Sequence, residues 1–89
     1  MTTLSVHHKI ADYPKWRAMF EQMDPIRRKF GETSYQVFRS ASDPLEITVH
    51  TEWPSADQAR AYATSPDLKA GMQNAGVVSQ PDVAFLESL

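Results

Sequence analysis

The stretch TLSVHHKIADYP, residues 3–14, carries the clearest structural signal in the chain. Its apolar and polar residues alternate, which is the period of a β-strand whose two faces differ. One face carries Leu4, Val6, His8 and Ile10, and the other carries Thr3, Ser5, His7 and Lys9. The sequence therefore predicts a strand over residues 3–10 with one strongly apolar face.

A helix is expected directly after this strand. Asp12 can accept a hydrogen bond from a free amide of the first turn, and Pro14 is tolerated there. An apolar stripe at spacings of three and four then predicts a helix that buries one face. The stripe consists of Trp16, Met19, Phe20, Met23, Ile26, Arg27 and Phe30. Pro25 should bend or divide this helix, and Gly31 should end it.

Residues 33–53 predict a β-hairpin, because two strand-like segments flank the turn formers at residues 41–44. One face of its second strand carries Leu45, Ile47, Val49, Thr51 and Trp53, and the other carries Glu46, Thr48, His50 and Glu52. Two helix starts follow, at Ser55 and at Ser65, and Gly76 should end the last helical stretch. The apolar tail over residues 82–86 predicts a fourth strand.

The element order is therefore that of a ferredoxin-like β-α-β-β-α-β sandwich, an α+β fold in which helices cover one face of a four-stranded antiparallel sheet. A chain of 89 residues allows one domain, over residues 1–89. A domain of this size buries only roughly 60% of the surface of its unfolded chain. We therefore expect a homodimer in which the uncovered sheet faces of two copies pack together.

The composition argues against several classes of function. The chain has no cysteine, and with only three glycines it has no phosphate-binding or dinucleotide-binding loop. A net charge of −2, with both signs scattered, gives no reason to expect nucleic acid or an anionic membrane as a partner. No apolar stretch approaches the ~20 residues of a bilayer span, and the amino terminus lacks the apolar core of a signal peptide. We expect a cytoplasmic protein without a cofactor.

The run from His8 to Tyr13 resembles small proteins of the dimeric α/β barrel superfamily, above all the antibiotic biosynthesis monooxygenase-like members. The resemblance continues through Trp16, Phe20, Arg27, Gly31, Arg39, Asp43-Pro44, Glu52-Trp53, Ala59, Ser65-Pro66 and Ala75-Gly76-Val77. It covers nearly the whole chain and implies a homodimeric barrel with facing sheets. The chemistries it implies include cofactor-free oxygenation of phenols, haem degradation, lactone isomerisation and polyketide cyclisation.

His8 is the candidate catalytic residue. It should point toward the helices, where this superfamily usually has its pocket. Because the unperturbed pKa of imidazole lies near neutrality, His8 could act as a general base, or it could donate a hydrogen bond to a bound phenol. The alternative is a core histidine that is hydrogen-bonded to the backbone or to a helix residue.

Five further residues are candidates for binding a flat substrate. The aromatic candidates are Trp53, Tyr13, Trp16 and Tyr62, although core packing also accounts for aromatic residues in so small a domain. Trp53 ends a strand just before a helix cap, where pocket mouths are common. Arg39 could neutralise an enolate or a carboxylate, or it could pair with a nearby acidic residue at the surface.

His7 and His50 fall on the opposite face of the sheet, on strands that should be adjacent. Together with Glu52 they could form a metal site or an acid/base pair. Two histidines on different strands lack any local ligand spacing, so we favour a solvated rim or a dimer interface and expect no metal. Haem degradation is disfavoured as well, because all three histidines lie on predicted strands and not on a helix.

The leading hypothesis from sequence is a cofactor-independent monooxygenase that acts on a phenolic or polyketide-like small molecule. A non-catalytic homodimer that binds a small metabolite, or serves as an accessory subunit, is the alternative from another class, and a cofactor-free cyclase or isomerase would need the same groups as the oxygenase. An enclosed cavity that holds His8 and a second polar group would favour an enzyme. An apolar or absent cavity would favour a binding or structural role.

Overall fold

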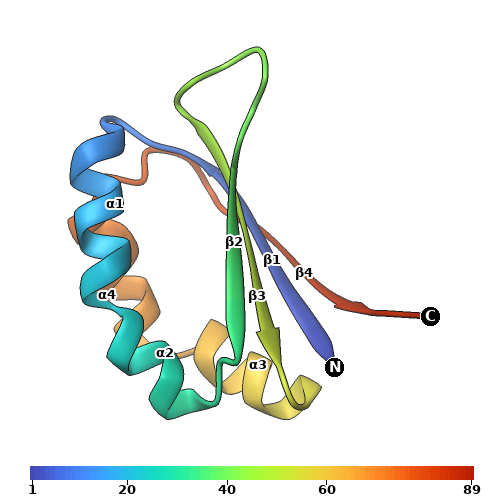
Figure 1. Ribbon diagram of the computed structural model, residues 1–89. Helices are drawn as coiled ribbons and strands as arrows, with labels where there is room; N and C mark the ends of the chain where they lie inside the picture. Colours follow the sequence, from blue (N-terminus) through green and yellow to red (C-terminus); the bar gives the residue numbers. More distant parts are fainter.

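The computed structural model describes residues 1–89 and contains one four-stranded antiparallel sheet with all four helices on the same face (Figure 1). The elements are β1 (Thr2–Lys9), α1 (Tyr13–Gln22), α2 (Asp24–Phe30), β2 (Ser34–Arg39), β3 (Glu46–Trp53), α3 (Ala56–Ala63), α4 (Pro66–Ala75) and β4 (Asp82–Glu87). The strand order across the sheet is β2-β3-β1-β4. The predicted α+β ferredoxin-like architecture is confirmed.

The helix ends form where the sequence predicts them. The side chain of Asp12 accepts a hydrogen bond from the backbone amide of Lys15, and Ser55 and Ser65 cap α3 and α4 in the same way. Pro25 divides the first predicted helix, since α1 ends at Gln22 and α2 begins at Asp24 with Pro25 in its first turn. Helices α2 and α4 each end at a glycine in the left-handed region, with φ of 114° at Gly31 and 80° at Gly76, whereas the C-cap of α3 is Thr64.

The two central strands, β1 and β3, form the floor of the core. Burial alternates strictly along both strands, so their inner residues are buried and their outer residues are half-exposed. Two apolar clusters cover this floor, one around Leu4, Trp53 and Tyr62 and one around Trp16, Ile47 and Ala75. Helix α1 packs against α4 above them. This inner layer contains His8.

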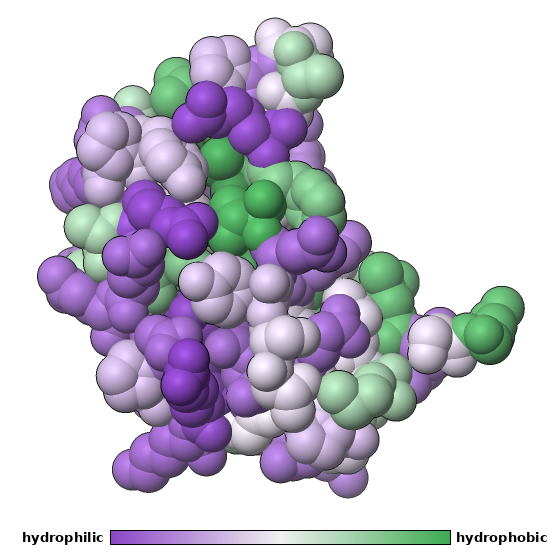
Figure 2. Space-filling view, viewed as in Figure 1, coloured by the Kyte–Doolittle hydropathy of each residue, from purple (hydrophilic) through white to green (hydrophobic).

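Strand β4 lies at the edge of the sheet and is exposed along its whole length. Its inner residues Val83 and Phe85 remain 47% and 40% exposed, because the helices cover β1 and β3 and do not extend over β4. Figure 2 shows apolar side chains at the surface toward the C-terminus, which follows β4. No helix in the chain has the length and hydropathy that a membrane span requires.

Candidate active site

A cavity of about 60 Å³ lies between the helices and the inner face of the sheet. Eleven of its fifteen lining residues are hydrophobic. The fifteen residues together come from β1, β3 and all four helices. The two strongly polar side chains in the lining are His8, from β1, and Arg27, from α2. The site is thus an apolar space with two polar groups, the composition typical of small-molecule pockets.

Trp16 determines which nitrogen of His8 carries the proton. The indole Nε1–H of Trp16 donates a hydrogen bond to Nε2 of His8 over 3.1 Å. Because an indole N–H only donates, Nε2 must be unprotonated, and the neutral ring carries its proton on Nδ1. The Nδ1 atom is buried and has no hydrogen-bond partner in the protein. His8 therefore offers an unused N–H donor on a ring that lines the cavity.

His8 is neutral at pH 7, and its basicity is lower than the sequence led us to expect. Burial and, to a smaller extent, the neighbouring His7 lower the pKa of His8 to about 4. The ring is therefore a weaker base than an unperturbed imidazole, because it lies among apolar side chains and its one basic nitrogen already accepts a hydrogen bond from Trp16. Of the two roles considered for His8, the geometry favours the hydrogen-bond donor.

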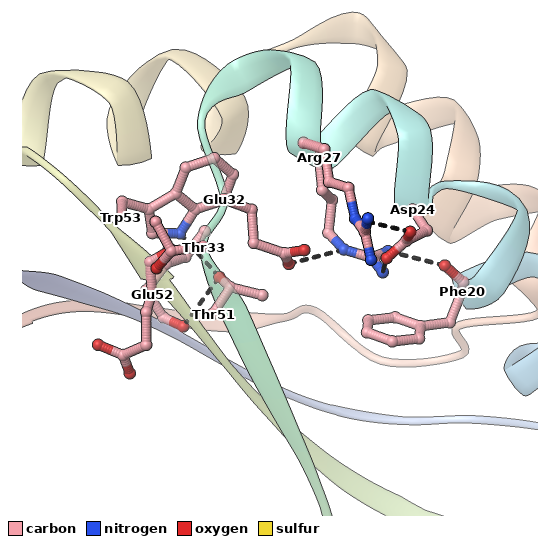
Figure 3. A network of polar contacts seen from close by, with 10 residues as sticks. Phe20, Asp24, Arg27, Glu32, Thr33, Thr51, Glu52 and Trp53 are labelled. Carbon is pink, nitrogen blue, oxygen red and sulfur yellow. Dashed lines mark hydrogen bonds and ion pairs between the residues drawn. The ribbon is translucent and has the colours of Figure 1, made fainter.

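Arg27 provides the positive charge of the site and is almost fully buried, with 2% of its side chain exposed. Its Nε donates to Glu32 over 2.8 Å, Nη2 to Asp24 over 3.2 Å, and Nη1 to the carbonyl oxygen of Phe20 over 2.7 Å (Figure 3). The guanidinium carbon also lies 3.8 Å from the centroid of the Phe20 ring. Arg27 is thus fixed in one orientation at the wall of the cavity.

The partners of Arg27 have altered acidities. Burial raises the pKa of Glu32, whose side chain is 3% exposed, and the Arg27 guanidinium opposes this increase. Burial also raises the pKa of Tyr62 to about 12, so its hydroxyl stays protonated at neutral pH. Tyr62 lines the cavity beside Arg27 and stacks on Trp53, with the ring centroids 5.2 Å apart.

Comparison with known proteins now defines the family. The family model described as antibiotic biosynthesis monooxygenase matches residues 11–74. This chain belongs to the antibiotic biosynthesis monooxygenase family. The matched segment contains Arg27 and Glu32 and most of the cavity wall, whereas His8 precedes it.

Solved structures share the fold of this family member at low sequence identity. A candidate antibiotic biosynthesis monooxygenase from Bordetella bronchiseptica is 15% identical, with 99% of this chain and 96% of that chain covered and a TM-score of 0.82. SnoaB from Streptomyces nogalater, described as a cofactor-independent oxygenase, is 10% identical, with 99% and 91% covered and a TM-score of 0.77. A conserved protein from Methanosarcina mazei is 11% identical, with 99% and 92% covered and a TM-score of 0.78. No curated protein matches this chain.

The structure brings together part of the residue set that the sequence singled out in this family member. His8, Trp16 and Tyr62 all line the cavity. Trp53 does not: it lies behind Tyr62, fully buried, and donates through Nε1 to Oγ1 of Thr51 over 2.9 Å.

Tyr13 and Arg39 lie outside the cavity lining as well. The Arg39 guanidinium lies 4.7 Å from the centroid of the Tyr13 ring. The two residues therefore contact each other, on the inner side of the sheet, and neither faces the space that His8 borders.

The histidines of the outer face lie on adjacent strands, as expected, but they have different partners. The register of β1 and β3 places His50 opposite Ser5 and His7 opposite Thr48, so the two residues are diagonal and not directly opposed. His7 contacts Glu46 over 2.6 Å and Asp82 over 3.5 Å, whereas His50 packs edge-on against Phe38. Glu52 accepts a hydrogen bond from Thr3. No cluster of His, Asp or Glu side chains in the chain is arranged to hold a metal ion.

Sequence reasoning did not identify Arg27 as a site residue. The helical period places Arg27 in the buried stripe of the first helix, which indicates packing, although Arg27, Arg28 and Lys29 are three consecutive basic residues. The signal that could have identified it is the combination of an arginine within an apolar stripe and an acid, Glu32, directly after the glycine that ends the helix. A buried arginine needs such a partner.

Proposed function

We propose that this protein is a cofactor-independent monooxygenase that acts on a phenolic or polyketide-like small molecule. The observation that supports this function most strongly is the apolar cavity with two polar groups of different character, the Nδ1–H of His8 and the cation of Arg27. A purely apolar cavity would have favoured a passive binding role. Family membership and the likeness to SnoaB, a cofactor-independent oxygenase, point in the same direction.

The two polar groups suit a substrate that reacts as an oxyanion. A phenol or anthrone loses a proton to give a phenolate or enolate, whose electron-rich carbon reduces oxygen directly. The overall change at that carbon is CH₂ plus O₂ to C=O plus H₂O. In this proposal, His8 donates its Nδ1–H to the oxyanion and Arg27 lowers its energy through its charge. Stabilising the anion lowers the pKa of the substrate, so the substrate gives its proton to the bulk solvent as it binds and the site does not need a strongly basic residue.

The apolar wall of the cavity contributes to the same step. When a ligand fills the cavity, little water can compete for the Nδ1–H of His8, and each electrostatic interaction is stronger in the low-dielectric interior. Trp16 keeps the donor on the correct nitrogen of His8. Trp16 is therefore a positioning residue in this proposal.

Oxygen uptake with dithranol and a panel of phenols tests the function. Wild-type protein should consume oxygen and release the oxidised product. His8→Gln keeps an amide that can accept from Trp16 and donate to substrate, so turnover should fall by less than about tenfold, whereas His8→Phe should lower it by about 10²-fold or more. A base at position 8 would instead make both variants equally inactive. His7→Gln, on the other face of the same strand, is the matched control.

Other outcomes of this assay would support the alternatives. Product formed without oxygen uptake would indicate a cyclase or isomerase. Binding of the phenols without turnover would indicate a metabolite-binding or accessory protein. Wild-type activity that is unchanged in folded His8→Phe would remove His8 from the mechanism.

We further propose that the protein is a homodimer in which the outer sheet faces of two copies pack together. The support is that all helices lie on one face of the sheet, while Phe38 and Leu86 on the other face are 42% and 45% exposed. Sedimentation velocity is the test. A dimer at micromolar concentration is expected, and a monomer at that concentration would overturn the arrangement.

A further inference from the structure

We propose that the groove between α4 and β4 is the outer half of the ligand site, and that Leu68 and Met72 form a gate between this groove and the inner cavity. The proposal rests on the proposed function in one respect, that the inner cavity receives the ligand. It adds where the rest of the ligand lies and which side chains must move.

Volume is the first argument. The inner cavity of about 60 Å³ has room for about two water molecules. An apolar cavity that holds benzene measures about 150 Å³, so the inner cavity with its walls in place is too small for one aromatic ring. The groove has a volume of about 720 Å³. A ligand with several rings therefore needs both spaces, joined.

Two side chains separate the spaces. Leu68 and Met72 line both the cavity and the groove, and they lie one turn apart on the same face of α4. Eleven of the fifteen residues that line the cavity are buried, and the four half-buried ones are Met19, Phe20, Leu68 and Met72. A ligand that enters the cavity must displace some of these four.

Phe20 and Met19 are held more firmly than the α4 pair. Phe20 stacks on Trp16 and lies under the Arg27 guanidinium, and its ring also meets Tyr35 edge-on. Met19 packs against both core clusters, so its displacement would disturb the whole interior. Leu68 and Met72 pack at the edge of one cluster only and face the open groove on their other side. Leu68 and Met72 therefore form the part of the wall whose displacement requires the least free energy.

The composition of the wall suits such a movement. Three of the four methionines in the chain, Met19, Met23 and Met72, line the cavity. An unbranched thioether side chain changes rotamer readily and fills spaces of irregular shape. Gly71 lies between Leu68 and Met72, and a Cβ there would collide with the Sδ of Met23, so the side chain of Met23 faces α4 directly at the gate.

The lining of the groove indicates what the outer part of the ligand carries. None of its thirteen residues is acidic, and Lys69 is its only charged side chain. Its other polar side chains are uncharged, and three of them can donate hydrogen bonds to a ligand: Gln73, Ser79 and Gln80. The hydroxyls of Thr64 and Ser65 already donate to the carbonyl oxygens of Arg60 and Tyr62. We infer an amphipathic, fused aromatic ligand whose oxyanion-bearing ring enters the cavity and whose hydroxylated or carboxylated part stays in the groove.

Binding of phenolic probes of increasing size tests the gate without any need for turnover. The probes are phenol, 1-naphthol and dithranol, with affinities from calorimetry and association rates from stopped-flow fluorescence. Met72→Ala and Leu68→Ala should speed association of 1-naphthol and dithranol by about tenfold, and Met72→Trp should slow it by about as much. Phenol also exceeds the cavity, but its single ring must displace less of the wall, so its association should change in the same direction by less than about threefold in each variant. Leu45→Ala, an exposed leucine in the hairpin turn, is the matched control and should change nothing.

The charge in the groove has its own readout. Lys69→Gln should weaken binding of 3-hydroxy-2-naphthoate by about fivefold relative to 2-naphthol, which lacks the carboxylate. Circular dichroism establishes that each variant is folded, and three different gate substitutions keep the test open if one of them fails to fold.

The possible results separate the gate from the oxygenase. Effects of the gate variants that are equal for phenol and dithranol, or absent for both, overturn the gate even if oxygen uptake with dithranol is observed. A size-dependent effect without any oxygen uptake supports the gate and overturns the oxygenase. If Lys69→Gln weakens the binding of 3-hydroxy-2-naphthoate and of 2-naphthol equally, the groove does not hold the carboxylated part of the ligand.

Discussion

His7 and His8 are consecutive residues on one strand, yet they lie in opposite environments. His8 is 4% exposed on the inner face, where burial lowers its pKa to about 4. The side chain of His7 is 38% exposed on the outer face, where the hydrogen bond that its ring donates to Glu46 raises its pKa. Strand alternation alone separates the two rings. The same side chain is therefore a neutral donor on one face of the sheet and a cation-forming group on the other.

Arg27 and Arg28 repeat this contrast on a helix. Arg27 is 2% exposed and pairs with the buried Glu32, whereas Arg28 is 71% exposed and pairs with Asp24 at the surface. Buried ion pairs leave a large penalty when one partner is removed, and exposed pairs do not. The inner layer thus carries polar groups that matter for both stability and chemistry, while the outer polar groups are individually replaceable.

Loss of the Arg27 charge should have the largest effect on stability. Arg27→Met should lower the free energy of unfolding by about 3–5 kcal/mol, because the carboxylate of Glu32 would remain buried without its partner. Arg28→Met should cost at most about 1 kcal/mol. Urea denaturation at pH 7 measures both variants. In the double variant Arg27→Met/Glu32→Gln part of the loss should be recovered, and a cost for Arg27→Met no greater than that for Arg28→Met would contradict the buried pair.

The pH dependence of stability should show the difference between the two histidines. The pKa of His8 falls from an unfolded value near 6.5 to about 4 on folding, so the unfolded state binds the proton more readily. The contribution of neutral His8 to the free energy of unfolding is complete above about pH 6.5. It declines by about 2–3 kcal/mol as the pH falls toward 4.

His8→Gln should remove this decline, as measured by urea denaturation from pH 7 to pH 4. His7 acts with the opposite sign: its pKa is raised on folding, so its contribution is present below about pH 6.5 and is lost as the pH rises through its folded pKa. His7→Gln should therefore leave the acid-side decline in place. An unchanged decline in His8→Gln would show that His8 is not the group that titrates.

Trp16→Phe should change the protonation pattern of His8. In the wild-type protein, nitrogen-15 chemical shifts of the His8 ring should show the proton on Nδ1 and a bare Nε2. Without the indole N–H, the proton should be shared between the two nitrogens, and stability should fall by roughly 1–2 kcal/mol from the lost hydrogen bond and volume. The ring of His7 provides an internal reference that should not change. A His8 ring with its proton on Nε2 in the wild type would contradict the donor role.

The smallest effect is expected on the outer face. His7→Gln at pH 7 should alter the free energy of unfolding by less than about 1 kcal/mol, because both His7 and its partners are accessible to solvent. Thermal denaturation measures this change. A large loss of stability in His7→Gln would mean that the outer face contains an essential polar network after all.

The sequence was sufficient to predict which face of a strand or helix a side chain lies on. It was not sufficient to predict whether that side chain reaches the cavity. Alternation over residues 3–10 placed His8 inward and His7 outward, and capping residues placed the helix starts. The hydrophobic period and the helix caps depend only on residues that are close in sequence, so both can be predicted from the sequence alone. Whether Trp53 reaches the cavity or lies behind Tyr62 depends on which ring packs above it, and that is a matter of tertiary packing.

The pKa of His8 and the role of Arg27 also could not be predicted from the local sequence pattern. The low pKa of His8 follows from its burial and, to a smaller extent, from the neighbouring His7. The position of its proton follows from the indole of Trp16, eight residues away. The pairing of Arg27 with Glu32 depends on the left-handed turn at Gly31, which brings the chain back so that the Glu32 amide also donates to the Arg27 carbonyl. A basic run in a sequence does not show that one of its members faces inward.

The most direct test of the account is a proton–nitrogen NMR titration of the histidine rings with 1-naphthol. If the inner cavity is the ligand site, the Nδ1–H resonance of His8 should shift and saturate with the added naphthol, while the ring of His7 stays unchanged. Shifts at His7 or His50, with the His8 resonance unmoved, would place the ligand on the outer face of the sheet and contradict the central claim.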